Sequence, residues 1–178
     1  MKLVPEASSV FRHQDYGGRP PIEGVEVRAL RRFGDDGGAM TELARFDGGI
    51  PAAFADFRLA QVNYSVLEPG VLKAFHVHAH QTDIWFVPPE DRILLVLIDV
   101  RDGSPSARHL MRMMLGDGSS HLVRIPPGVA HGCKNLGDRA ARIIYMTDVP
   151  FDSDPRSTDE GRLPWDLVGA AVWEPAKD

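Results

Sequence analysis

Short runs of alternating hydrophobic and polar residues recur along the chain, and each ends at a turn rich in glycine, proline or aspartate. Alternation with a period of two is typical of strands that bury one face. The runs cover residues 25–29, 40–46, 59–66, 84–87, 92–100, 108–115, 121–125 and 142–147. This spacing predicts an all-β sandwich or barrel. We expect residues 1–24 to form an arm or loop, and short helices at 50–57 and between 163 and 173.

One predicted strand is unusual because it carries three of the seven histidines of the chain. His76, His78 and His80 stand at every second position, so an extended backbone places them on one face. Regular alternation assigns Lys73 to the opposite face. Apolar residues on both faces are typical of an inner strand, and imidazoles gathered there indicate a pocket.

Composition narrows the class of protein. The 178 residues predict a single domain, 1–178, and the net charge of −5 argues against nucleic acid as the main partner. No apolar run approaches the roughly 18 residues of a membrane span, and the first residues lack the apolar core of a signal peptide. Cys133 is the only cysteine, which excludes an internal disulfide. These features predict a cytoplasmic protein without a membrane partner.

Two histidine motifs resemble those of the cupin family. In the first, Gly70 precedes His76 and His78, and an acid follows at Asp83. In the second, residues 126–128 read Pro-Pro-Gly, and His131 and Asn135 follow at the family's spacing. The resemblance implies a jelly-roll β-barrel with its site inside, to which the pattern adds a short C-terminal helical segment.

A closer resemblance, to the dTDP-4-dehydrorhamnose 3,5-epimerase family, covers most of the chain. The matching residues are Phe33, Asp35, Gly38 and Glu42 in a turn, Gln61, Asn63 and Ser65 on a strand, residues 71–76, residues 126–132, Tyr145, and Trp165-Asp166. The resemblance implies that His76 is the general base, Tyr145 the catalytic acid and Asp166 the carboxylate that orients the base. It implies substrate-binding roles for Gln61, Asn63, Lys73, His131 and Glu42. It also implies a homodimer, a nucleotide-sugar substrate and no metal or other cofactor.

These residue types suit the implied reaction. Epimerisation beside a carbonyl removes a proton from one face of a sugar ring and returns a proton to the other face. Histidine is suited as the base because its pKa lies near neutrality, and a carboxylate on its second nitrogen fixes the tautomer. The enolate oxygen needs hydrogen-bond donors in a dry pocket. His131, Lys73 or Asn63 would supply them.

The sequence also departs from the family pattern. Gly37 and Lys73 replace arginines, and Asp83 replaces a lysine. Lys73 and His76 can share a pocket only if the strand bends between them. Two alternatives therefore remain open: a metal-dependent cupin, either a dioxygenase or an isomerase, and a non-catalytic sugar-binding cupin. The metal ligands in the first alternative would be His76, His78, Asp83 and His131.

Overall fold

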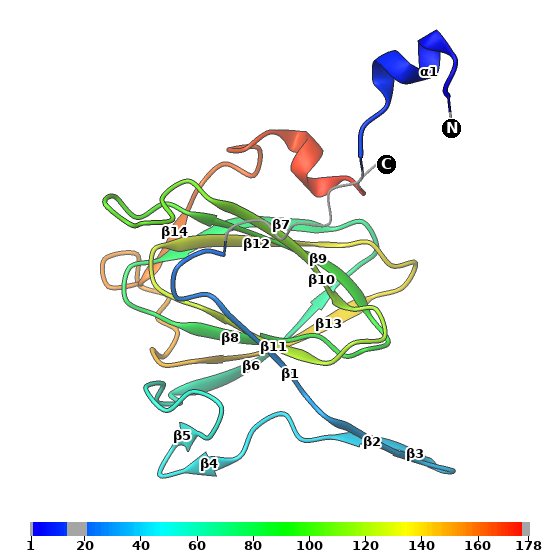
Figure 1. Cartoon of the computed structure of the whole chain (residues 1–178). Helices are drawn as coiled ribbons and strands as arrows, with labels where there is room; N and C mark the ends of the chain where they lie inside the picture. Colours follow the sequence, from blue (N-terminus) through cyan, green and yellow to red (C-terminus); the bar gives the residue numbers. More distant parts are fainter. Residues whose placement is uncertain (1, 14–20, 176–178) are drawn as a thin grey trace.

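Two five-stranded antiparallel sheets face each other in the computed structural model, which describes residues 2–13 and 21–175 (Figure 1). The first, called here the β6 sheet, has the order β1 (Glu26–Ala29), β11 (His121–Ile125), β8 (Asp83–Phe86), β13 (Ala141–Thr147) and β6 (Gln61–Leu67). The second, the β7 sheet, has the order β10 (Leu110–Gly116), β9 (Arg92–Asp99), β12 (Val129–Asn135), β7 (Leu72–His78) and β14 (Glu160–Arg162). The all-β prediction is confirmed.

Strand β9 shows how the sequence builds two layers of core. Its side chains alternate between the space enclosed by the two sheets, where Leu95 and Leu97 are buried, and the outer face of the β7 sheet. There Val96 packs with Val172 and Trp173 from the C-terminal segment. Burial on both faces explains why this strand is continuously apolar rather than alternating.

The C-terminal segment forms the short helical element that the sequence predicts. It is a single 3-10 turn, η1 (Ala170–Trp173), and Trp173 is only 1% exposed. The indole nitrogen of Trp173 donates to the carbonyl oxygen of Trp165, so the segment is fixed against the barrel. The amino-terminal arm contains a helix, α1 (Pro5–Val10), that the sequence analysis did not predict and that has no buried residue.

The expected helix at 50–57 is wrong. Two short strands, β4 (Phe46–Asp47) and β5 (Ile50–Pro51), pair here, and turns follow. Phe54 and Phe57 insert into an apolar cluster on the outer face of the β6 sheet, where they contact residues of β8, β11 and β13. Docking of two aromatic side chains three positions apart is therefore achieved by turns rather than by a helix.

A second hairpin comprises β2 (Arg32–Asp35) and β3 (Gly38–Thr41) and extends away from the barrel (Figure 1). The predicted strand at 40–46 is thus divided between this hairpin and β4. None of the helices in the described part of the chain is long and apolar enough to cross a membrane.

Candidate active site

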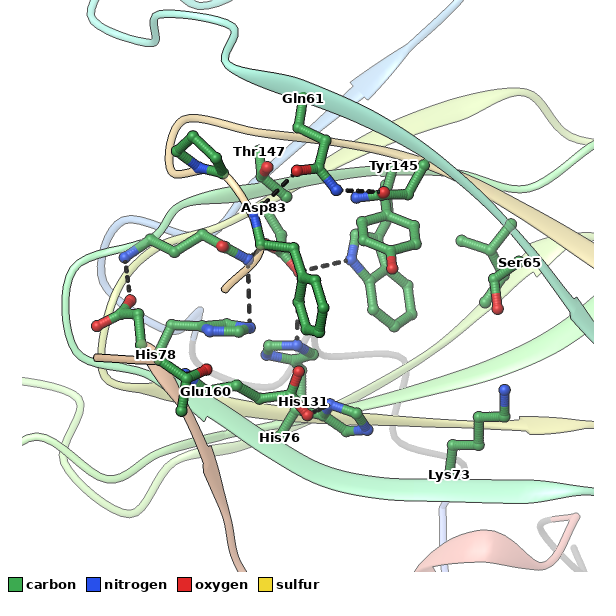
Figure 2. A pocket seen from close by; sticks show the side chains of 18 of the residues that line it. Gln61, Ser65, Lys73, His76, His78, Asp83, His131, Tyr145, Thr147 and Glu160 are labelled. Atoms are coloured by element: carbon green, nitrogen blue, oxygen red, sulfur yellow. Dashed lines mark hydrogen bonds and ion pairs between the residues drawn. The ribbon is translucent and has the colours of Figure 1, made fainter. Parts of the chain in front are cut away.

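A cavity of about 370 Å³ lies between the two sheets. The β6 sheet contributes one wall and the β7 sheet the other (Figure 2), and residues 150–152, 158 and 159 line the cavity as well. Polar side chains converge on this space from both walls. They include Gln61, Asn63, Lys73, His76, His78, Asp83, His131, Tyr145 and Glu160. A cavity on which a few polar side chains converge is typical of a ligand site.

His76 is held at both of its ring nitrogens. Nδ1 lies 3.0 Å from Oε1 of Glu160, and Nε2 lies 2.8 Å from a guanidinium nitrogen of Arg162. A carboxylate only accepts hydrogen bonds and a guanidinium only donates them, so the proton of the neutral ring is on Nδ1 and the lone pair is on Nε2. Burial, followed by the charges of His131 and Arg162, lowers the pKa of His76 to about 4, while Glu160 acts in the opposite direction.

Strand β14 places both partners of His76. Arg162 is opposite His76 and Glu160 is opposite His78 in the antiparallel pairing of β14 with β7. Because side chains two positions apart share a face, both charged groups of β14 reach the imidazole. Gly161 between them faces Val77, where an added Cβ would lie 3.1 Å from a Val77 methyl carbon.

Three imidazoles form a stack across the β7 sheet. The ring of His131, from β12, lies 5.9 Å from that of His76 and 5.4 Å from that of His78. Nδ1 of His131 lies 3.2 Å from the carbonyl oxygen of Val129, and Nε2 lies 3.5 Å from Oδ2 of Asp83. Burial lowers the pKa of His131, although the charge of Asp83 opposes the shift. Both nitrogens of this neutral ring thus face acceptor oxygens, which fixes its position between Val129 and Asp83.

Tyr145 faces His76 across the cavity. It lies on β13 of the β6 sheet and is half-buried beside Trp85, whose ring centroid is 6.1 Å away. Burial, with smaller effects from Asp83 and Glu160, raises the pKa of Tyr145. The phenol therefore holds its proton at neutral pH. His76 and Tyr145, which the family resemblance implies are base and acid, thus lie on the two sheets that enclose the cavity.

A β-bulge brings Lys73 to the cavity. His131 pairs with His76 and Cys133 with Lys73, so two steps along β12 correspond to three steps along β7. The extra residue makes Ala74 and Phe75 both pack against the outer apolar cluster. This is the bend that the sequence analysis required.

The carboxylate of Asp83 is satisfied by neighbouring donors. The side-chain amide of Gln81 donates to Oδ1 at 2.6 Å, and the indole nitrogen of Trp85 donates to Oδ2 at 3.0 Å. One ligand atom each of His78, Asp83 and His131 lies within 4.8 Å of the others. His76 is not part of that group, and its nitrogens contact Glu160 and Arg162 instead. Among the described residues, three of the four side chains of the alternative metal site are therefore close together, and the fourth is not.

Not all of the predicted substrate-binding residues line the cavity. Gln61 and Asn63 do line the cavity, and the amide of Gln61 donates to Oδ1 of Asn63 at 2.6 Å. Glu42 is outside it, exposed and paired with Arg45. His80 is also exposed, because β7 ends at His78 and the chain turns.

The expected pairing of Asp166 with His76 is not made. Asp166 is exposed on a turn, where its carbonyl oxygen accepts from Gly169, and it does not line the cavity. Glu160 is the carboxylate that contacts His76. Sequence reasoning missed Glu160 and Arg162 because residues 152–162 are polar throughout. The one sequence feature that indicates a strand here is the alternation of Glu160, Gly161 and Arg162 before the apolar Leu163.

The chain is similar in sequence and in fold to several known proteins. The spore coat polysaccharide biosynthesis protein SpsL of Bacillus subtilis is 38% identical over 145 residues, 82% of this chain and 91% of that protein. A probable low-salt glycan biosynthesis epimerase of Haloferax volcanii is 33% identical over 148 residues, 83% of this chain and 90% of that protein. The crystal structure of NovW, a 4-keto-6-deoxy sugar epimerase from the novobiocin biosynthetic gene cluster of Streptomyces spheroides, superposes with a TM-score of 0.72. It is 26% identical and covers 98% of this chain and 84% of that chain.

The fold and the histidine-lined cavity define a cupin-type jelly roll with a candidate acid–base site inside. The model of the dTDP-4-dehydrorhamnose 3,5-epimerase family matches residues 19–166. The chain belongs to this family of enzymes.

Proposed function

We propose that this protein epimerises a nucleotide-linked 4-keto-6-deoxy sugar, at C3, C5 or both, by proton transfer between His76, the sugar and Tyr145. The observation that carries the proposal is the position of these two side chains on opposite walls of one cavity. Inversion of a carbon centre needs a base on one face and an acid on the other, and this arrangement provides both.

The reaction follows from the protonation states. Nε2 of His76 takes the proton from the carbon beside the carbonyl, and the electron pair of the C–H bond moves into an enolate. The phenol of Tyr145 then delivers its proton to the opposite face of that carbon, and the resulting phenolate regains a proton from solvent. Glu160, 3.0 Å from Nδ1, stabilises the imidazolium that forms on the base.

The enolate oxygen needs a donor that is present before the reaction begins. Lys73 is the one lysine or arginine among the cavity-lining residues of the described chain, and Asn63 lies on the facing wall. His131, which is buried and lines the cavity, would contact the sugar there. Groups fixed by two sheets cost little reorganisation when charge develops in the transition state.

We further propose that the protein is cytoplasmic, that it forms a single domain and that it acts as a homodimer. Edge strand β6 supports the dimer, because its outward side chains Val62, Tyr64 and Val66 are 56%, 64% and 44% exposed. An exposed apolar edge strand is normally covered, and a symmetric pairing of two copies would do so. Sedimentation of Tyr64→Lys beside the wild type tests this, with a dimer expected only for the wild type.

The test of the function is deuterium wash-in. The protein is incubated in heavy water with dTDP-4-keto-6-deoxyglucose and with related keto-sugar nucleotides, and NMR follows C3 and C5. We expect deuterium at one or both centres of at least one substrate. Binding of the nucleotide sugars without any exchange would show a binding protein instead.

A further inference from the structure

The lone pair that the proposed base uses is occupied. Arg162 lies 2.8 Å from Nε2 of His76, and a guanidinium can only donate to that nitrogen. Glu160 occupies the other nitrogen, so the ring has no free site for a proton. A base whose lone pair already accepts a hydrogen bond cannot take a proton from carbon. Arg162 therefore has to leave Nε2 before the reaction can begin.

The position of Arg162 permits this movement. It is the last residue of edge strand β14, and its side chain is 61% exposed, whereas that of His76 is 24% exposed. Arg162 also forms an ion pair with Oε1 of Glu160, at 2.7 Å. An exposed ion pair contributes little to stability, so a stronger anion can displace it.

Nucleotide sugars carry such an anion, and the cavity has few cations to receive it. Lys73 is the one cationic side chain among the described lining residues, while the lining also includes Asp83, Asp152, Asp159 and Glu160. A guanidinium matches a phosphate with two parallel hydrogen bonds, which an ammonium cannot do. Arg162 contacts His76, which lines the cavity, and its own side chain is largely exposed, so it is accessible to a diphosphate that binds beside His76.

We propose that Arg162 is a movable cap, which closes the lone pair of His76 in the free protein and transfers to the phosphates of the nucleotide when it binds. The inference rests on the proposed function for its catalytic meaning. Binding of the nucleotide then exposes the base only when a substrate is present. The low pKa of His76 agrees with a base that is held neutral until that moment.

The probe for the test is dTDP, which contains the diphosphate without the sugar. Long-range ¹⁵N–¹H NMR spectra of the free protein report whether Nε2 of His76 accepts a hydrogen bond, and a His76→Gln variant assigns the signal. We compare the wild type with Arg162→Met, which cannot donate. The matched control is Arg156→Met, since Arg156 is 87% exposed and pairs with Asp154 rather than with His76 or Glu160.

We expect the Nε2 signal in Arg162→Met to move to the position of an unprotonated nitrogen that accepts no hydrogen bond. Addition of dTDP should move the wild-type signal in the same direction and leave that of Arg162→Met in place. Calorimetry should show about tenfold weaker dTDP binding for Arg162→Met, equal to about 1.4 kcal/mol. Arg156→Met should match the wild type in both measurements.

Steady-state kinetics distinguish a capping role of Arg162 from a purely structural one. For Arg162→Met we expect KM to rise about tenfold and kcat to change less than about twofold, because the base is uncapped in both bound complexes. Equal Nε2 signals in wild type and Arg162→Met, or equal dTDP affinities, would overturn the cap. Absence of deuterium wash-in together with the expected dTDP response would count against the epimerase and support the cap.

Discussion

Lys73 and His76 line the same cavity although three steps along one strand separate them. A regular strand would place them on opposite faces. The β-bulge at Ala74 and Phe75, opposite Gly132 of β12, brings both side chains to the same face. The one cationic side chain among the described lining residues is thus available to the site only because the strand is irregular.

Gly132→Ala should disturb this arrangement. An added Cβ at Gly132 would lie 2.8 Å from a ring carbon of Trp173 and still closer to Ala74. Crowding of a packed site typically costs about 1–3 kcal/mol, which denaturant titration would measure as a loss of unfolding free energy. Gly34→Ala is the control, since its nearest neighbour would be 3.6 Å away, and a change within about 0.5 kcal/mol is expected. Equal losses in both variants would contradict close packing at Gly132.

Glu160→Gln and Asp166→Asn distinguish the two carboxylates proposed for orienting the base. Glu160 contacts Nδ1 of His76 and raises its pKa, so its neutral replacement leaves the imidazolium less stable. We expect the exchange rate to fall about 100-fold in Glu160→Gln. Asp166 is exposed, and Asp166→Asn should stay within about twofold of the wild type. The opposite ranking of the two variants would return the role to Asp166.

Tyr145→Phe should separate exchange from inversion. His76 would still remove the substrate proton, but the opposite face would lack its donor. We therefore expect deuterium to enter with retained configuration, while epimerised product falls at least about 100-fold. NMR of one reaction mixture reports both quantities. Normal inversion in this variant would show that another group is the acid.

Stability should rise with pH between about 4 and 6.5. The pKa of His76 is lowered to about 4, and that of His131 is also lowered, so the unfolded chain binds more protons in this window. Each such proton adds about 1.4 kcal/mol per pH unit to the slope of unfolding free energy. Urea titrations of wild type and His76→Gln should show a shallower slope for the variant and a constant difference above about pH 7. Identical slopes would mean that His76 is not held neutral by the fold.

Alternation predicted most of the barrel strands because their inward and outward side chains differ in polarity. Strand β11 matched residues 121–125, and β9 matched within one residue. Strand β12 is absent from the predicted strands, since its histidine and glycine interrupt the apolar pattern. Resemblance to the family placed His76 and Tyr145, which local patterns alone could not pair across two sheets.

Contacts that depend on distant pairing were beyond the sequence. Strand β14 is three residues long and polar, so only its pairing with β7 makes it a strand. Glu160 and Arg162 therefore could not be identified as partners of His76. The sequence shows only that Lys73 and His76 can share a cavity if the strand bends. The bulge itself is visible only in the register between β7 and β12.

The central claim is that His76 removes a proton from a nucleotide-linked keto sugar. The most direct measurement is deuterium wash-in at C3 and C5 of dTDP-4-keto-6-deoxyglucose, with wild type and folded His76→Gln side by side at neutral pH. We expect exchange by the wild type and a loss of at least about 100-fold in the variant. Equal exchange by the two proteins would contradict it.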